Sequence, residues 1–249
     1  MIHLPHGETN VTLACQNRCV SCNHFIPLQD AWFINPLDFA RDLAKASQIV
    51  HFDVFNLVGG EPTLHPDIVL LLQFIKTSGI ADRAEITSNG QSHRKWSDEL
   101  YQNVDDLIIT PYKLADEDIA EITEKCRQFN VNLQWHPVIF TTAAYKQPHT
   151  DQYAGQLYRQ CWYNRNRQVI DGGYFYRCCT APFIPQLLLG LPKEHDGITL
   201  DGLTEERLNE YLNQPQTPAS CTVCASNCGR RIQWSEQADR NQWLAESLG

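Results

Sequence analysis

Short apolar runs alternate with amphipathic stretches in the first half of the chain, and this alternation constrains the fold more than any other feature. The apolar runs that we predict to be strands are Thr9–Ala14, Val54–Val58, Ala84–Ser88, Asp106–Thr110 and Asn132–Ile139. Between them, apolar residues recur at the spacing of a helix that buries one face. Strands that alternate with helices form a parallel sheet with helical crossovers, so an α/β fold is expected.

Capping residues indicate where the helices begin and end. Asn35-Pro36 has the form of an N-cap followed by proline in the first turn. A second helix is expected to open at His65-Pro66 and to end at Gly79, and a third to occupy Asp116–Phe129. These helices are the expected crossovers between the strands.

The second half of the chain lacks this alternation. Residues 168–177 predict a β-hairpin around the turn Asp171-Gly172-Gly173. Helices are expected near Thr204–Leu212 and Asp239–Leu248, and the cysteines between them follow neither a helical nor a strand period. We therefore expect two domains, residues 1–150 and residues 151–249.

Length and charge argue against several classes of protein. The chain has 249 residues and ten cysteines, and a core of this size needs no disulfides. The formal net charge of −9 argues against nucleic acid as a partner. The apolar runs are too short to span a membrane, and the first residues lack the pattern of a secretion signal. We expect a cytoplasmic protein without membrane contact, whose thiols are buried, reactive or bound to metal.

Three of the cysteines, Cys15, Cys19 and Cys22, follow the first predicted strand, at the carboxyl edge of the sheet where α/β folds place their sites. Three thiolates at this spacing could bind three irons of a [4Fe–4S] cluster and leave the fourth iron open. A structural zinc ion normally takes four protein ligands, for which His24 is the nearest candidate. The residues alone favour an iron–sulfur cluster and leave zinc or incidental thiols as alternatives.

Gly59-Gly60-Glu61-Pro62 follows the second predicted strand. Two glycines allow the backbone to approach a ligand closely, although a simple turn would also explain them. Together with the cysteine spacing and with Thr87-Ser88-Asn89-Gly90 after the third strand, this segment resembles the radical S-adenosylmethionine (radical SAM) enzymes. The resemblance covers residues 8–140 and implies a partial (β/α)6 barrel.

The resemblance also implies roles for individual residues. The three cysteines would bind the cluster, whose open iron would chelate the amino and carboxylate groups of SAM. Residues expected to contact SAM are Gly59, Gly60, Glu61, Ser88, Asn89 and Thr110. Family members usually carry an aromatic residue before the third cysteine. This chain has Ser21 there, so Phe25 or His24 is the expected substitute near the adenine.

A second group of cysteines lies in the second half of the chain: Cys161, Cys178, Cys221, Cys224 and Cys228. On spacing alone, a zinc ribbon is an alternative explanation. Beside a radical SAM core the spacing resembles the twitch module, a shortened SPASM extension that binds one auxiliary [4Fe–4S] cluster. We assign Cys161, Cys178, Cys221 and Cys224 as its ligands, with Cys228 as the rival for the last place. The remaining thiols are those of Cys126 and Cys179.

The resemblance implies two [4Fe–4S] clusters and a 5′-deoxyadenosyl radical that takes a hydrogen atom from a substrate carbon. We expect a small polar substrate and a two-electron oxidation, with the auxiliary cluster as electron acceptor. The layout is similar to the 2-deoxy-scyllo-inosamine dehydrogenase subgroup, which oxidises a secondary alcohol. Candidate bases at strand ends are Tyr112, Lys113 and His136. The implied electron donor is a flavodoxin or a ferredoxin.

The same residues are also compatible with other reactions and with a protein that has no enzymatic activity. An epimerase would need a thiol as hydrogen donor, for which Cys126, Cys179 and Cys228 are the candidates. A cyclase or crosslinking enzyme would act on a peptide or a nucleotide. A zinc-binding protein without enzymatic activity is the least favoured alternative.

Overall fold

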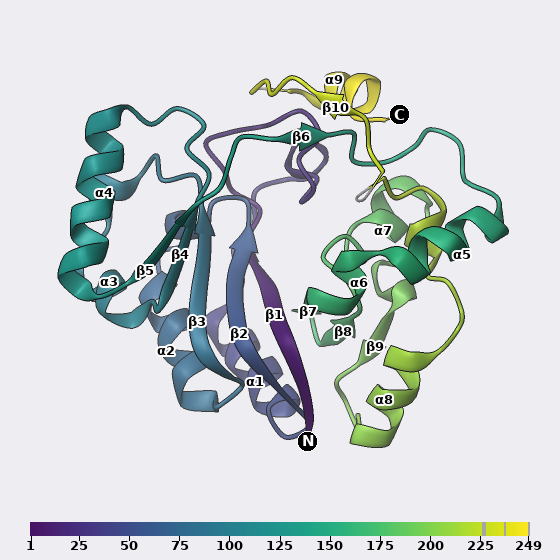
Figure 1. Ribbon diagram of the computed structural model, residues 1–249. Coiled ribbons are helices and arrows are strands. Elements are labelled where there is room, and N and C mark those ends of the chain that lie inside the picture. Colours follow the sequence, from purple (N-terminus) through teal and green to yellow (C-terminus); the bar gives the residue numbers. More distant parts are fainter. Residues whose placement is uncertain (226–227, 237, 249) are drawn as a thin grey trace. The chain divides into compact units, whose positions relative to one another are not determined.

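The computed structural model describes residues 1–225, 228–236 and 238–248. The chain forms two compact units (Figure 1). The first is built from His3–Ala14 and Ala31–Val138, and the second from Cys15–Asp30 and Ile139–Gly249. The loop with the first three cysteines therefore belongs to the second unit. The functional division into residues 1–150 and 151–249 stays a prediction.

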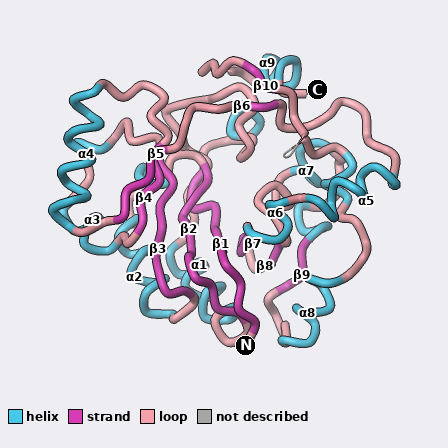
Figure 2. Tube along the Cα trace, in the orientation of Figure 1, coloured by secondary structure: helices cyan, strands magenta, loops and turns pink. Residues whose placement is uncertain are grey.

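The first unit contains a sheet in the strand order β5-β4-β3-β2-β1, drawn in magenta in Figure 2. Its strands are β1 (Ile2–Thr12), β2 (Val50–Gly59), β3 (Ala81–Ser88), β4 (Asp106–Ile109) and β5 (Asn132–Trp135). The pairs β2/β3, β3/β4 and β4/β5 are parallel. The predicted α/β fold with a parallel sheet is confirmed. β1 begins at Ile2 rather than Thr9, and β5 ends at Trp135 rather than Ile139.

Four helices line one side of this sheet in Figure 1: α1 (Pro36–Ala46), α2 (Ile68–Ser78), α3 (Asp98–Asn103) and α4 (Asp116–Phe129). The Asn35 side chain accepts hydrogen bonds from the backbone N–H groups of Leu37 and Asp38, so the predicted N-cap of α1 is confirmed. Helix α2 begins at Ile68, later than His65-Pro66, and ends at Ser78 with Gly79, the predicted end, as its C-cap. Short 3₁₀ turns connect the elements at η2 (Pro62–Leu64) and η3 (His93–Lys95).

The core of the first unit lies between the sheet and these helices. Phe52, Phe55 and Leu57 of β2 are fully buried, as are Leu71 and Leu72 of α2. The last five residues of β2 are all buried, which is typical of a central parallel strand covered on both faces. Burial of residues 55–58 of the apolar run thus fixes the position of β2, whose carboxyl end leads into the Gly59-Gly60 turn.

The second unit contains the predicted hairpin, formed by β7 (Gln168–Asp171) and β8 (Tyr174–Tyr176), with β9 (Gly197–Thr199) antiparallel to β8. The strand β6 (Phe140–Thr141) pairs antiparallel with β10 (Arg231–Ile232). The helices are α5 (Asp151–Gln160), α6 (Trp162–Asn166), α7 (Ile184–Leu188), α8 (Glu205–Asn213) and α9 (Arg240–Glu246). Short 3₁₀ turns are η1 (Ile26–Leu28), η4 (Lys193–Asp196) and η5 (Ala219–Thr222).

Within the described ranges, the helices are all too short or too polar to cross a lipid bilayer.

Candidate functional site

The turn after β2 lies directly against the backbone at the end of β1. The Gly60 N–H donates to the Thr12 carbonyl at 2.7 Å, and the Glu61 N–H donates to the Ala14 carbonyl at 2.8 Å. A Cβ atom at Gly59 would lie 2.2 Å from the Thr12 oxygen, and one at Gly60 would lie 2.2 Å from the Ala14 oxygen. Gly59 also has a φ of +124°, a backbone conformation that residues with a side chain rarely adopt. The two glycines therefore allow a backbone contact that ends one residue before Cys15.

Glu61 is fully buried at the carboxyl edge of the sheet and holds two strand ends together. Its Oε1 accepts hydrogen bonds from Thr63 Oγ1 at 2.6 Å, Ser88 Oγ at 2.7 Å and Thr63 N at 3.2 Å. Its Oε2 accepts one from Asn89 N at 2.7 Å. Burial raises the pKa of this carboxyl above its ordinary value, and the hydrogen bonds oppose that shift. No sequence motif singles out Thr63, which lies inside η2; the Glu61 side chain caps this turn by accepting from the Thr63 N–H.

The other predicted SAM contacts lie at the same edge of the sheet. Ser88 and Asn89 are buried, and the Thr110 N–H donates to the Ser88 carbonyl at 3.0 Å. The His136 N–H donates to the Ile109 carbonyl at 2.8 Å, so His136 follows β5 directly beside the end of β4. The parallel register thus brings Glu61, Ser88, Thr110 and His136 to adjacent strand ends, as expected for a sheet of this kind.

The two other candidate bases lie in the loop after β4. Tyr112 is half-buried, and its N–H donates to the Thr110 carbonyl at 2.9 Å. Lys113 is exposed and lines a cavity of about 340 Å³ together with η3 and the start of α4. His136 is exposed as well. The role of these three residues as bases stays a prediction.

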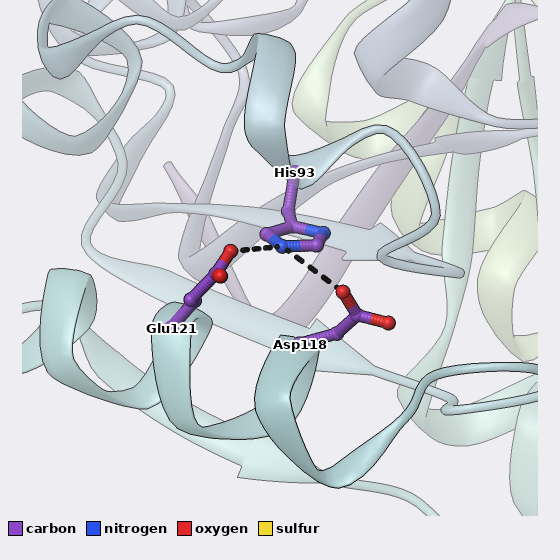
Figure 3. Close-up of side chains that lie close together, drawn as sticks. All are labelled: His93, Asp118 and Glu121. Carbon is purple, nitrogen blue, oxygen red and sulfur yellow. Dashed lines mark hydrogen bonds and ion pairs between the residues drawn. The ribbon is translucent and has the colours of Figure 1, made fainter.

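The wall of that cavity contains an ion-pair network between η3 and α4. Figure 3 shows the His93 ring facing two carboxylates of α4, with Nε2 at 3.0 Å from Glu121 Oε2 and 3.6 Å from Asp118 Oδ1. Arg94 pairs with the same two carboxylates at 3.0 and 2.8 Å. His93 Nδ1 also contacts the Gly90 carbonyl at 3.0 Å. Through these contacts His93 and Arg94 join the loop after β3 to α4.

The loop with the first three cysteines is held by the second unit. Cys19 is buried, with 7 % of its surface exposed, and burial raises the pKa of its thiol to about 11. Its Sγ accepts a hydrogen bond from Trp234 Nε1 at 3.2 Å. Burial also raises the pKa of Cys22, whose N–H donates to the Cys19 carbonyl at 3.3 Å. Three cysteines on one short loop, with a donor directed at one sulfur, fit a set of iron ligands.

The aromatic residues after Cys22 point toward the interior of the second unit. Phe25 is fully buried and packs against Phe183 and Trp243, with ring centroids 5.8 and 5.2 Å apart. Its φ of +56° turns the chain at this point. The half-buried His24 ring meets Phe183 edge-on at 6.0 Å. Because the Phe25 ring is enclosed by protein, an adenine contact from Phe25 would need this packing to open.

Four thiols of the second cysteine group lie near one another. Burial, and next the nearby thiols of Cys224 and Cys161, raise the pKa of Cys178 to about 12. Burial, and next Cys178, Cys224 and Cys161, also raise the pKa of Cys221. The Thr180 hydroxyl lies 3.7 Å from the Cys178 sulfur and 3.8 Å from the Cys224 sulfur. The fold thus places Cys178 and Cys224 beside one hydroxyl, with Cys161 close enough to influence the pKa of Cys178 and Cys221, and the ligand role of the four thiols stays a prediction.

A buried carboxylate positions the turn with Cys221. Asp196 accepts hydrogen bonds from Ala219 N at 2.9 Å, from Ser220 N at 2.8 Å and from the Ser220 hydroxyl. These bonds hold the start of η5, the turn that contains Cys221. The sequence contains no motif that pairs Asp196 with this turn, because the two segments meet only in the folded unit.

The remaining thiols have different surroundings. Cys228 is exposed, and Tyr145 OH lies 3.5 Å from its sulfur. Cys179 is buried in an apolar cluster with Val169 and Tyr176. Cys126 is buried on α4, and burial raises the pKa of its thiol to about 11.

Comparisons with known proteins bear on the fold. No protein-family model and no curated protein sequence matches the chain. The crystal structure of BtrN in complex with AdoMet and 2-DOIA matches with a TM-score of 0.53 and 11 % sequence identity, over 88 % of this chain and 84 % of BtrN. SuiB from Streptococcus suis, bound to S-adenosylmethionine, matches with a TM-score of 0.48 and 15 % identity, over 85 % of this chain and 66 % of SuiB.

BtrN is a radical SAM enzyme. The likeness to BtrN spans most of both chains and shows a shared fold. The resemblance to radical SAM enzymes that the motifs predict is therefore confirmed at the level of the fold.

Proposed function

We propose that this chain is a radical SAM enzyme. The observation that carries the proposal is the contact of the Gly59-Gly60-Glu61 turn with the end of β1, where Glu61 N donates to the carbonyl of Ala14, the residue before Cys15. The turn and the cysteine motif are far apart in the sequence, yet the turn is bonded to the segment that leads into the cysteines. The shared fold with BtrN, solved with AdoMet bound, supports the same function.

In this proposal Cys15, Cys19 and Cys22 bind the first [4Fe–4S] cluster. When bound, the cluster and SAM supply a 5′-deoxyadenosyl radical that takes a hydrogen atom from the substrate. The Gly59-Gly60 turn presents backbone close to the methionine end of SAM. Both oxygens of the Glu61 carboxylate are already hydrogen bonded inside the protein, so we assign Glu61 the task of fixing this turn against Ser88 and Asn89.

We further propose that Cys161, Cys178, Cys221 and Cys224 bind an auxiliary [4Fe–4S] cluster. The mutual influence of these thiols and the Thr180 hydroxyl beside two of the sulfurs support this set. Four thiolates would leave the cluster without an open site for substrate. Its task would then be to accept an electron.

The reaction that we propose is the two-electron oxidation of a small polar alcohol to a carbonyl. The substrate carbon would give one hydrogen atom to the radical, its hydroxyl would give a proton to a base, and the remaining electron would pass to the auxiliary cluster. Cleavage of SAM would consume one electron from a reduced flavodoxin or ferredoxin. The substrate oxidation would release one electron, so the number of electrons taken up equals the number released. BtrN was solved with 2-DOIA, which supports a small-molecule substrate here.

Among the candidate bases, His136 follows β5 at the strand edge that also holds Ser88 and Thr110. Tyr112 lies in the loop after β4, with its N–H bonded to the Thr110 carbonyl, whereas Lys113 in the same loop lines the cavity beside η3. We therefore favour His136 or Tyr112 for the proton. None of the ten cysteines forms a disulfide, which fits a reducing compartment, and we place the protein in the cytoplasm.

The test is anaerobic reconstitution with iron and sulfide, followed by incubation with SAM and dithionite. We expect about eight irons per chain, four for each cluster, and formation of 5′-deoxyadenosine. The Cys15→Ala variant should lose about four irons and all SAM cleavage, whereas Cys126→Ala, which removes a buried thiol outside both groups, should keep both. Zinc in place of iron, or SAM left intact by the reconstituted protein, would refute the proposal.

A further inference from the structure

Trp234 lies far from Cys19 in the sequence but is hydrogen bonded to it. The indole Nε1 donates to the Cys19 sulfur at 3.2 Å, and both residues are at least partly shielded from solvent. An indole N–H is a donor only, so the sulfur must be the acceptor in this hydrogen bond. The sulfur is one of the three that the proposed function assigns to the first cluster.

The bond between Trp234 and Cys19 is part of a longer contact between the C-terminal segment and the cysteine loop. Figure 1 shows this segment in yellow, with α9 beside the purple loop before α1. Val20 N donates to the Ser235 carbonyl at 3.0 Å, and Ala238 N donates to the Arg18 carbonyl at 2.7 Å. These two backbone bonds lie on either side of Cys19 in the sequence and hold that part of the loop.

The end of α9 fixes the same loop at a second place. Ser21 N donates to the hydroxyl of Ser247 at 2.7 Å, and Ser21 has a φ of +55°. Trp243 of α9 is fully buried and packs on Phe25 with ring centroids 5.2 Å apart. Its Nε1 is buried without a hydrogen-bond partner among the described residues. Trp243 thus anchors the helix by packing, whereas Trp234 presents a polar hydrogen to a sulfur.

A hydrogen bond to a cluster sulfur favours the more negative state of that cluster. Reduction adds one negative charge, and a donor at 3.2 Å from a ligating sulfur stabilises that charge. The potential at which a cluster accepts an electron therefore rises with such a bond and falls when the bond is lost. In a radical SAM enzyme this electron is the one that cleaves SAM.

We propose that Trp234 is a positioning residue of the first cluster: its indole N–H raises the reduction potential of the cluster held by Cys15, Cys19 and Cys22. The inference rests on the proposed function. The C-terminal segment would then influence how readily the first cluster accepts its electron, in addition to holding the cysteine loop through backbone hydrogen bonds. Trp234→Phe removes the donor and keeps an aromatic ring, and Trp243→Phe is the matched control without a hydrogen bond to lose.

The test is a redox titration followed by electron paramagnetic resonance on anaerobically reconstituted protein. The first cluster is recognised as the one whose signal changes when SAM is added. For Trp234→Phe we expect a more negative midpoint, up to about tenfold in the reduction equilibrium, or about 59 mV for one electron. Trp243→Phe should leave the midpoint at the wild-type value. Trp234→His restores a ring N–H and should recover part of the shift.

Three results would overturn the inference. One is an unchanged midpoint in Trp234→Phe, and another is an equal shift in Trp243→Phe, which would indicate a packing effect. The third is a first cluster lost from Trp234→Phe and not recovered in Trp234→His. A wild-type chain that binds no iron at Cys15, Cys19 and Cys22 would remove the proposed function as well, whereas a wild-type cluster with an unshifted variant removes this inference alone.

Discussion

Ser88 Oγ donates a 2.7 Å hydrogen bond to Glu61 Oε1, and this bond joins the end of β3 to the turn after β2. Both side chains are buried, and three further donors from Thr63 and Asn89 complete the shell around the carboxylate. The edge of the sheet is therefore ordered by an acid that has no solvent contact.

Glu61→Gln should destabilise the chain by about 1–3 kcal/mol. The amide would place an N–H against either the Asn89 N–H or the Thr63 N–H, so one buried donor loses its acceptor. Urea unfolding of the variant measures the loss. Glu124→Gln, on the exposed side of α4, is the control and should unfold close to wild type. Equal midpoints for Glu61→Gln and wild type would contradict this account.

Gly60→Ala should prevent correct folding, or cost about 3 kcal/mol or more, because its Cβ would lie 2.2 Å from the Ala14 carbonyl oxygen. Neither of these two atoms is a flexible side-chain end that could move away. Gly79→Ala is the comparison: Gly79 has a φ of +67° but open space around it, so it should cost about 1 kcal/mol. Thermal unfolding followed by circular dichroism separates the two, and a Gly60→Ala variant as stable as Gly79→Ala would refute the close approach.

Cys221→Ser should lower the iron content of the reconstituted chain by about four, because η5 brings Cys221 to the other three thiols of its group. Cys228→Ser should leave the iron content unchanged, since the exposed Cys228 contacts Tyr145 instead. Iron and sulfide analysis measures both variants. Loss of iron from Cys228→Ser with retention in Cys221→Ser would reverse the assignment.

Cys126 should react slowly with iodoacetamide in the folded protein. Burial raises the pKa of its thiol from 9.0 to about 11, so at pH 8 the thiolate fraction falls about a hundredfold, before steric protection is counted. Peptide mass spectrometry after timed alkylation gives the rate at each cysteine. The exposed Cys228 serves as the internal reference, and equal rates at Cys126 and Cys228 would show that α4 does not protect its thiol.

The contribution of Glu121 to stability should depend on pH. Its hydrogen bonds to Arg94 and then His93 lower the pKa of this carboxyl in the folded state. A lowered folded pKa means that the stabilisation is present above the ordinary glutamate pKa and is lost as the pH falls through the folded value. The difference in urea midpoint between wild type and Glu121→Gln should therefore shrink between pH 7 and pH 3. A difference that grows toward acid pH would contradict the sign.

The sequence was sufficient to predict the elements whose signals are local. The Asn35 cap of α1, the bounds of α4 and the turn at Gly172-Gly173 depend on neighbouring residues, and the structure has them where the pattern predicts. The start of β1 was misplaced because residues 2–8 include charged and polar side chains, and pairing in the sheet makes them a strand. The strands β6 and β10 have two residues each, too few to show a period.

The features of the candidate site also fall into those that depend on neighbouring residues and those that depend on the folded chain. Cysteine spacing and the Gly-Gly-Glu segment are contiguous motifs, so the sequence by itself determined the expected cofactor chemistry and the radical SAM resemblance. The tertiary structure alone decided that Glu61 is enclosed by Ser88 and Asn89, that Asp196 holds η5 and that Trp234 donates to Cys19. The physical reason is that a hydrogen bond depends on distance and direction in space, and residues 19 and 234 acquire both only when the chain has folded.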